Sequence, residues 1–309
     1  MKRLLYILLP IISIVLLSSC IKEKYDDCER CTLTFSYLGD GTSDIFPEKI
    51  TDVSLYVYDA AGVLVQTKHI EQNELKAFQG TKLNLSQGVY HVVGVGNSFS
   101  KTEINAPAST ADLSDGYFNH PNAEKGGKIE GNDSLYLGRQ TINVPNDWYE
   151  ADVPFRSSHL KVSYTVKVKG ANWMPMTRAL TDGHFTLEVN NLTPLTDFEN
   201  NTFGSATTYE PVLPLDIEDY IHKGYFNIMR HPKQNDVEFV LTENETGEVI
   251  HTLRLEDFLN EFPQIDVTKQ EVLIPIVVEL GYLGDICTEV TVTIPEWMIK
   301  DVTPGFGDN

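Results

Sequence analysis

Cysteine is scarce in this chain of 309 residues, and three of its four cysteines fall within the first 31 positions. The fourth, Cys287, stands alone near the carboxyl end, so the sequence has no dense disulfide framework of the kind that supports small secreted domains. A zinc site needs several ligands at ordered spacing, but the eight histidines form no H-x3-5-H pair. We therefore predict no metal site and no cofactor.

Long apolar runs and catalytic motifs are also missing. The longest uncharged apolar stretch, residues 4–17, has 14 residues, whereas a membrane-spanning helix needs about 20. The sequence contains no G-x-S-x-G elbow and no P-loop, and "GVGN" at Gly94 lacks the third glycine of a dinucleotide site. We assign no catalytic residue and predict that the protein is not an enzyme.

The charge balance is strongly acidic, with 44 Asp and Glu against 24 Lys and Arg and a formal net charge of −20. Binding to DNA or RNA depends on clustered Lys and Arg side chains that neutralise phosphates. The composition therefore argues against a nucleic-acid partner and mainly favours solubility. With 41% hydrophobic residues, the chain still has enough apolar side chains to bury sizeable cores.

The amino-terminal segment has the features of an export signal. Lys2 and Arg3 give a basic start, and the apolar run of residues 4–17 has the length of a signal-peptide h-region. The residues that follow resemble the lipobox of bacterial lipoproteins: Leu17, Ser18, Ser19 and Cys20. We expect residues 1–19 to be a lipoprotein signal peptide.

The lipobox resemblance implies that Cys20 becomes the first residue of the mature chain. Its sulfur would receive a diacylglyceryl group, and its new amino group would be acylated. Each buried methylene contributes about 0.8 kcal/mol, so one acyl chain binds a membrane marginally whereas two or more anchor it stably. We predict membrane attachment through lipid on Cys20 and a short tether over residues 20–31.

Cys28 and Cys31 have C-x-x-C spacing. A redox motif of this kind needs a helix amino terminus and an electropositive setting that lowers the thiol pKa. Acidic residues surround this pair, and a strand-like segment follows it. We favour a structural disulfide, either between Cys28 and Cys31 or between one of them and Cys287.

Most of the remaining sequence alternates apolar and polar residues, as strands with one buried face do. The alternation is clearest in residues 159–170, where five apolar side chains share one face: Leu160, Val162, Tyr164, Val166 and Val168. Further strands are predicted within residues 32–37, 53–70, 82–97, 134–144, 150–155, 184–192, 225–230, 237–255, 271–280 and 289–297.

Few segments break this pattern. Only residues 256–261 and 217–222 favour a helix, and the polar residues 98–133 are expected to form a surface loop. Many short strands at regular spacing predict an all-β sandwich fold. Two similar hairpins, turning at Gly62 and Gly247, agree with two sandwiches in tandem. We predict domains at residues 32–155 and 156–309.

Taken in order, the segments of the chain resemble a known family. The lipobox is followed by "CTLTFSYLGDG", "ITDVSLYVYDAAGVLV", "LNLSQGVYHVVGVGN", "SLYLGRQTINV" and "HLKVSYTVKVKG". This order is similar to that of the fimbrillin-A-associated anchor proteins of Bacteroidales, the FimB-like lipoproteins of type V pili. The resemblance implies two transthyretin-like β-sandwich domains, outer-membrane anchoring and pilin subunits as partners. It also implies a place at the base of a fimbria, where the protein attaches the filament and limits its length.

The resemblance also raises the question of proteolysis. In type V pilins it implies that a protease removes the first strand and opens a groove for a neighbouring subunit. Here the corresponding strand, residues 32–37, lies about a dozen residues from Cys20, so cutting after Arg30 would detach the body from its lipid. We predict that Arg30 stays uncut. The tail "MIKDVTPGFGDN" contains a proline and two glycines, so it is a poor donor strand.

Two other functions remain open. A glycan-binding surface lipoprotein would use exposed aromatic side chains as sugar platforms, and the candidates are Trp148, Tyr149, Trp173 and Trp297. An accessory or tip subunit of the same fimbria would share the fold and the lipobox.

The densest acidic cluster of the chain is Asp216, Glu218 and Asp219. A calcium site is one interpretation, because carboxylates are preferred calcium ligands. We favour a solvated turn or helix start instead.

Overall fold

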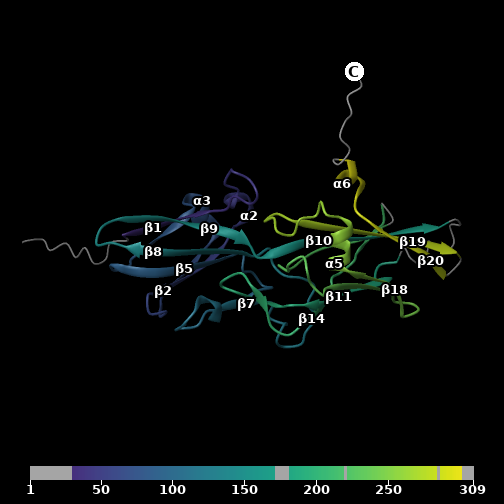
Figure 1. Ribbon diagram of the computed structural model, residues 1–309, viewed down its shortest axis with the longest axis horizontal. Helices are drawn as coiled ribbons and strands as arrows, with labels where there is room; N and C mark the ends of the chain where they lie inside the picture. Colours follow the sequence, from purple (N-terminus) through teal and green to yellow (C-terminus); the bar gives the residue numbers. More distant parts are fainter. Residues whose placement is uncertain (1–29, 171–180, 219–220, 284–285, 301–309) are drawn as a thin grey trace, which may run out of the picture.

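The structure is a computed structural model that describes residues 30–170, 181–218, 221–283 and 286–300. Strands dominate this part of the chain, and the helices in it are short. The molecule is elongated, with β1, β2, β5 and β8 at one end and β18, β19 and β20 at the other (Figure 1). In the described part, no helix has the length and apolar character needed to cross a membrane. The prediction of an all-β fold is confirmed.

The first sheet has seven strands in the order β3-β2-β5-β8-β9-β1-β4. Its strands are β1 Cys31–Ser36, β2 Val53–Asp59, β3 Leu64–Ile70, β4 Gly80–Leu83, β5 Gly88–Gly96, β8 Tyr136–Val144 and β9 Tyr149–Ser157, with the short helices α2 Phe46–Lys49 and α3 Gln72–Ala77. The two edges approach one another, because Lys68 Nζ on β3 donates to the carbonyl of Lys82 on β4 (3.4 Å). The sheet encloses a core that includes Leu33, Phe35 and Phe155.

Two further sheets face each other as a sandwich. The five-stranded sheet has the order β15-β16-β10-β19-β20, and the four-stranded sheet has the order β14-β11-β17-β18. The elements of this sandwich are β10 His159–Gly170, β11 Phe185–Leu192, β14 Thr207–Tyr209, β15 Leu215–Asp216, β16 Ile221–Met229, β17 Glu238–Glu243, β18 Glu248–Arg254, α5 Leu255–Glu261, β19 Leu273–Leu283, β20 Ile286–Thr293 and α6 Glu296–Lys300. The alternating face of β10 is buried as predicted, and Tyr164 stacks on Phe239 of the opposite sheet.

A small fourth sheet, β13-β12-β7-β6, joins distant parts of the chain. It consists of β6 Glu103–Asn105, β7 Tyr117–Asn119, β12 Leu195–Asp197 and β13 Thr202–Phe203, and the 3-10 helix η2 Leu113–Asp115 precedes β7. β7 pairs with β12, with Asn119 opposite Leu195. The expectation that residues 98–133 form only a surface loop is therefore wrong. Strands of three residues are too short to show an alternation in the sequence.

One predicted helix is also wrong. Ile221 and His222, from the segment expected to be helical, belong to β16, where His222 lies opposite Val166 of β10. The long pairing with β10 overrides the weak local preference for a helix, because strand formation depends on cross-strand packing. The other predicted helix is confirmed as α5.

The first sheet and the sandwich are joined without a linker. β9 ends at Ser157 and β10 begins at His159, so only the buried Ser158 separates them. A third core lies between them and contains side chains from all three regions. Its members include Tyr58 and Val93 of the first sheet, Phe118 and Phe198 in or near the small sheet, and Met229 of β16. The division into two domains at residues 155 and 156 stays a prediction.

Phe198 is the side chain through which we test this junction. It is fully buried, stacks on Tyr56 (6.0 Å between ring centroids), and its ring lies against Gly116. We expect Phe198→Ala to lower the free energy of unfolding by about 3–5 kcal/mol, because it opens a cavity in the third core. Urea unfolding followed by circular dichroism measures this loss.

Phe203→Ala is the matched control. Phe203 is 39% exposed, and its ring makes an edge-to-face contact with Tyr117. Its loss should cost about 1 kcal/mol or less. Equal losses for the two variants would contradict the role given to Phe198.

Candidate functional site

The described chain begins at Arg30, directly before the first strand. The carbonyl of Arg30 accepts a hydrogen bond from the N–H of Tyr149 (2.9 Å), and the Arg30 guanidinium reaches the carbonyl of Asn146 (3.4 Å). β1 then runs between β9 and β4, and all six of its residues pair with β9. The first strand is thus an interior strand of the sheet.

The predicted lipidation residues, Leu17, Ser18, Ser19 and Cys20, lie outside the described residues, and so does Cys28. Cys31 is buried in β1 and Cys287 is half-buried in β20, and no disulfide joins these two residues. Burial raises the pKa of the Cys31 thiol to about 11, so this thiol is a poor nucleophile. A disulfide that involves Cys28 stays a prediction.

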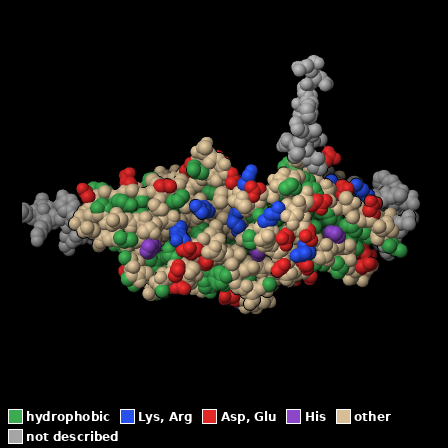
Figure 2. All heavy atoms as spheres, in the orientation of Figure 1, with side chains coloured by type: hydrophobic (Ala, Val, Ile, Leu, Met, Phe, Trp, Pro, Cys, Tyr) green, Lys and Arg blue, Asp and Glu red, His purple; other side chains and the backbone are tan. Residues whose placement is uncertain are grey.

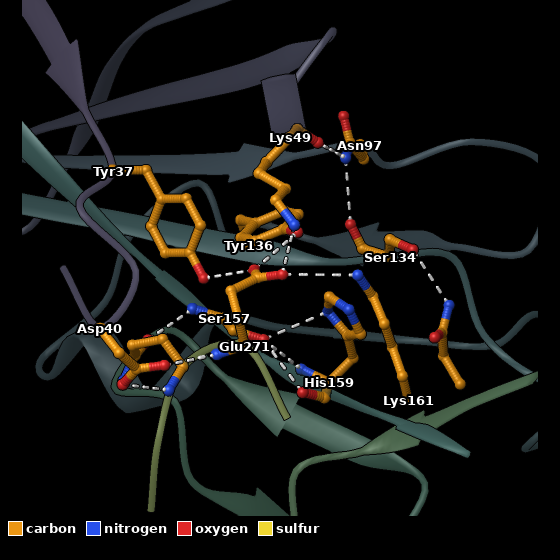
Figure 3. A network of polar contacts seen from close by, with 12 residues as sticks. Tyr37, Asp40, Lys49, Asn97, Ser134, Tyr136, Ser157, His159, Lys161 and Glu271 are labelled. Carbon is orange, nitrogen blue, oxygen red and sulfur yellow. Dashed lines mark hydrogen bonds and ion pairs between the residues drawn. The ribbon is translucent and has the colours of Figure 1, made fainter. Parts of the chain in front are cut away.

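The carboxylate of Glu271 lies at the centre of a polar network between the first sheet and the sandwich (Figure 3). Tyr37 Oη donates to Glu271 Oε1 (2.7 Å), and Lys49 Nζ contacts Oε2 (2.6 Å). Lys161 Nζ, from β10, lies 3.5 Å from the same Oε2 atom, and Tyr136 Oη lies 3.3 Å from Oε1. One carboxylate thus binds donors from both parts of the molecule.

Burial by itself would raise the pKa of Glu271, but its surroundings outweigh this effect. Hydrogen bonds from Lys49 and Tyr37, with the positive charges of Lys161 and Lys49, hold the pKa below its usual range. The ionised form is therefore the stable one in the fold. For Tyr37, burial and the neighbouring carboxylate raise the pKa, so its hydroxyl remains a donor.

The loop after β1 adds a second contact to the same region. Asp40 accepts the backbone N–H groups of Gln270 (2.9 Å) and Glu271 (3.0 Å), through its two carboxylate oxygens. Arg230, on the sandwich side, donates to the carbonyls of Ser157 (3.1 Å) and Val267 (2.7 Å). Arg230 also donates to the carbonyl of His159 (3.5 Å), so its guanidinium contacts the chain on both sides of Ser158.

His159 is a neutral member of the junction. Its Nδ1 donates to the carbonyl of Leu135 (2.9 Å), and burial lowers the pKa of His159 to about 4. No sequence pattern signals this network, because its members are separated by up to 234 residues along the chain.

The aromatic candidates for a glycan platform do not come together in the described part of the chain. Trp148 lies in the turn between β8 and β9 and is 66% exposed, whereas the neighbouring Tyr149 packs against the core of the first sheet. Trp297 lies in α6 and is 59% exposed, and Trp173 lies outside the described residues. These positions favour no shared sugar site.

The predicted acidic cluster is only partly described. The carboxylate of Asp216 accepts the backbone N–H of Glu218 (3.1 Å), as in a turn, and Asp219 lies outside the described residues. No group of three or more His, Cys, Asp or Glu side chains suited to a metal ion occurs within the described ranges.

Open sheet edges are the other feature with functional potential, because unpaired backbone groups at an edge can bind a strand of another chain. Among the described strands, those that combine an edge position with more than four residues are β3, β18 and β20. β3 is partly covered, since Leu64 N–H donates to the carbonyl of Ala108 and Thr110 N–H to that of Gly62. β18 and β20 lie beside each other on one side of the sandwich.

β20 is the least protected of these edges. Natural edge strands carry Lys, Pro or inward charges that discourage pairing with other chains. β20 has none of these; Glu289 is its only acid, and most of its residues are β-branched: Ile286, Thr288, Val290, Thr291, Val292 and Thr293. One register shift occurs opposite its start, between Gly281 and Tyr282, and the rest pairs regularly with β19. Within the described residues, the strand thus presents a regular edge with no paired strand.

The described residues thus form an elongated strand-rich body with a packed first strand at one end and an unpaired edge strand, β20, at the other. The chain belongs to the fimbrillin-A associated anchor protein family, whose model, described for Mfa1 and Mfa2, matches residues 25–303. No curated protein matches the sequence.

Solved structures share the fold at low sequence identity. The chain is similar to the fimbrial anchor protein Mfa2 of Porphyromonas gingivalis, with a TM-score of 0.60 and 13% identity over 85% of this chain and 96% of that one. A candidate adhesin of Bacteroides ovatus gives a TM-score of 0.71 and 18% identity over 86% and 94% of the two chains. A candidate polysaccharide-binding protein of Bacteroides thetaiotaomicron gives 0.65 and 15% over 85% and 95%.

Glu271→Gln tests the junction network. Removal of the charge leaves Lys49 and Tyr37 without their ionic acceptor, so we expect a loss of about 1–3 kcal/mol in the free energy of unfolding near neutral pH. The pKa of Glu271 is lowered by folding, so its contribution is present above the unfolded pKa and lost as pH falls through the folded pKa. The difference between wild type and variant should shrink in acid, measured by urea unfolding from pH 7 to pH 3.

Glu279→Gln is the matched control. Glu279 has the same 22% exposed side chain as Glu271 and pairs with Lys169, but that lysine is 66% exposed. Its loss should cost less than about 1 kcal/mol. A Glu271 effect no larger than this, or one that grows in acid, would contradict the network.

Proposed function

We propose that this protein is the anchor subunit at the base of a fimbria, held in the outer membrane by lipid on Cys20. Family membership supports association with fimbrial subunits. The observation that carries the more specific proposal is the position of β1, which follows the tether at once and is paired on both sides. The first strand fills its own place in the sheet and leaves no groove there for a neighbouring subunit.

Two observations, a hydrogen bond and the burial of Cys31, argue that the chain is not cut after Arg30. The carbonyl of Arg30 is hydrogen-bonded to Tyr149, and Cys31, on the other side of the peptide bond, is fully buried. A protease needs several extended and accessible residues around the bond that it cuts. The uncut chain keeps its lipid, and a subunit that accepts no strand at this end would stop the polymer and so limit filament length.

The free edge of β20 is our candidate for the filament contact. Strand addition there would satisfy the backbone groups of Glu289–Thr293 and would use the alternating side chains for specificity. The edge lies at the end of the molecule remote from β1 (Figure 1). Acidic and basic side chains are interspersed over the face shown in Figure 2, so charge alone does not select another site on that face.

Cys20→Ala tests the lipid anchor. In cells that lack the pilin genes, we expect the variant to move from the membrane pellet to the soluble fraction, because no acyl chain holds it. Cys28→Ala is the matched control and should remain in the pellet. Amino-terminal analysis of the native protein should find Cys20 first. A variant that still pellets, or a native chain that begins at Cys31, would refute the anchor mechanism.

Thr291→Lys tests the docking edge. Thr291 is an exposed residue of β20, and a lysine there introduces the charge that natural edges use against strand pairing. We expect the cells to shed their filaments, seen by electron microscopy, while the variant itself stays in the membrane. Thr67→Lys makes the same change at an exposed position of the β3 edge and should leave filaments attached. If filaments stay attached in cells that carry Thr291→Lys, the filament contact is not at the β20 edge.

A further inference from the structure

Trp148 is a large apolar side chain with no cover in the described structure. It lies in the turn between β8 and β9, and 66% of it is exposed. Its backbone N–H is satisfied by the carboxylate of Asp147 (2.8 Å), so the turn is well formed without help from the indole ring. The ring is therefore available for a contact outside the local fold.

Strand register places Trp148 at the end of the first sheet that is remote from the sandwich. Tyr149, the next residue, lies opposite Cys31, and Val144 lies opposite Gly88. The start of β1, the start of β5 and the β8–β9 turn therefore meet at one end, which lies at the left in Figure 1. Val89, at the start of β5, is 39% exposed and adds a second apolar side chain to this end.

The chain enters the first sheet at the same end. The carbonyl of Arg30 accepts the N–H of Tyr149, so the end of the tether lies next to Trp148 along the backbone. Nine residues lie between Cys20 and Arg30, so the two are at most about 35 Å apart even in a fully extended chain. With lipid on Cys20, this end of the molecule is the end held close to the bilayer.

The chemistry of the indole ring fits that location. Tryptophan has an apolar body and one N–H donor, and it is enriched where hydrocarbon meets water at membrane surfaces. The acids Asp147 and Glu150 flank Trp148 and outnumber Arg30, whose guanidinium contacts the carbonyl of Asn146 (3.4 Å), and the whole chain is acidic, so attraction to anionic headgroups would add little here. Burial of the indole ring among lipid headgroups is the remaining interaction that could hold this end at a membrane.

We propose that Trp148 is a second membrane contact, with its ring in the headgroup layer of a lipid bilayer. The proposal rests on the lipid anchor at Cys20. Acyl chains and indole ring together hold the molecule at two points, so that the long axis stands away from the membrane and β20 is presented outward. A single tether would leave the body free to tilt.

Depth-dependent quenching tests this proposal with the lipidated full-length protein in phosphatidylcholine vesicles. One variant keeps only Trp148, through Trp173→Phe and Trp297→Phe, and the matched variant keeps only Trp297, through Trp148→Phe and Trp173→Phe. Both rings are strongly exposed in the protein. With brominated phosphatidylcholine, we expect Trp148 to lose more than half of its fluorescence and shift to the blue, while Trp297 is unchanged.

Three results would overturn the proposal, and they are distinguishable. If the protein binds the vesicles but brominated lipid quenches the two variants equally, the Trp148 contact is rejected and the lipid anchor is still supported. Loss of the quenching at high salt would show a contact made by charged groups and not by the ring. Failure of the native protein to float with vesicles would remove both the contact and the proposed function.

Discussion

The structure depends on one ionised carboxylate that is shared across a junction. Glu271 lies just before β19. It binds Tyr37 and Lys49 from the first sheet's side of the junction and Lys161 from the sandwich. A charge in such a place is stable only when its donors are held around it, because desolvation alone would neutralise it. The network therefore favours a single arrangement of the first sheet and the sandwich.

The covalent chain enforces the same arrangement. Ser158 is the only residue between β9 and β10, which leaves no flexible linker. The third core, with Phe198 at its centre, and the pairing of β7 with β12 add apolar and backbone contacts on another side. These contacts oppose hinge motion at the junction, which suits the proposed role at the base of a filament.

Much of the fold could be predicted from the sequence, because alternation in β10 and in the hairpins at Gly62 and Gly247 reports directly which face is buried. The short strands β6 and β7 could not, since three residues show no period and the second partner of β7, β12, lies far along the chain. The junction was equally hidden. Glu271 is one acid among 44, and only folding brings it to Tyr37, 234 residues away.

A distance measured across the junction tests the rigid arrangement most directly. Spin labels on genetically encoded residues at Asn143 in β8 and Thr291 in β20 report the separation of the two ends by pulsed electron resonance, for the lipidated protein in vesicles. A single narrow distance distribution at neutral pH is predicted, because Glu271, the third core and Ser158 allow one arrangement. A broad or two-peaked distribution would show that the two parts move independently and would contradict a rigid anchor.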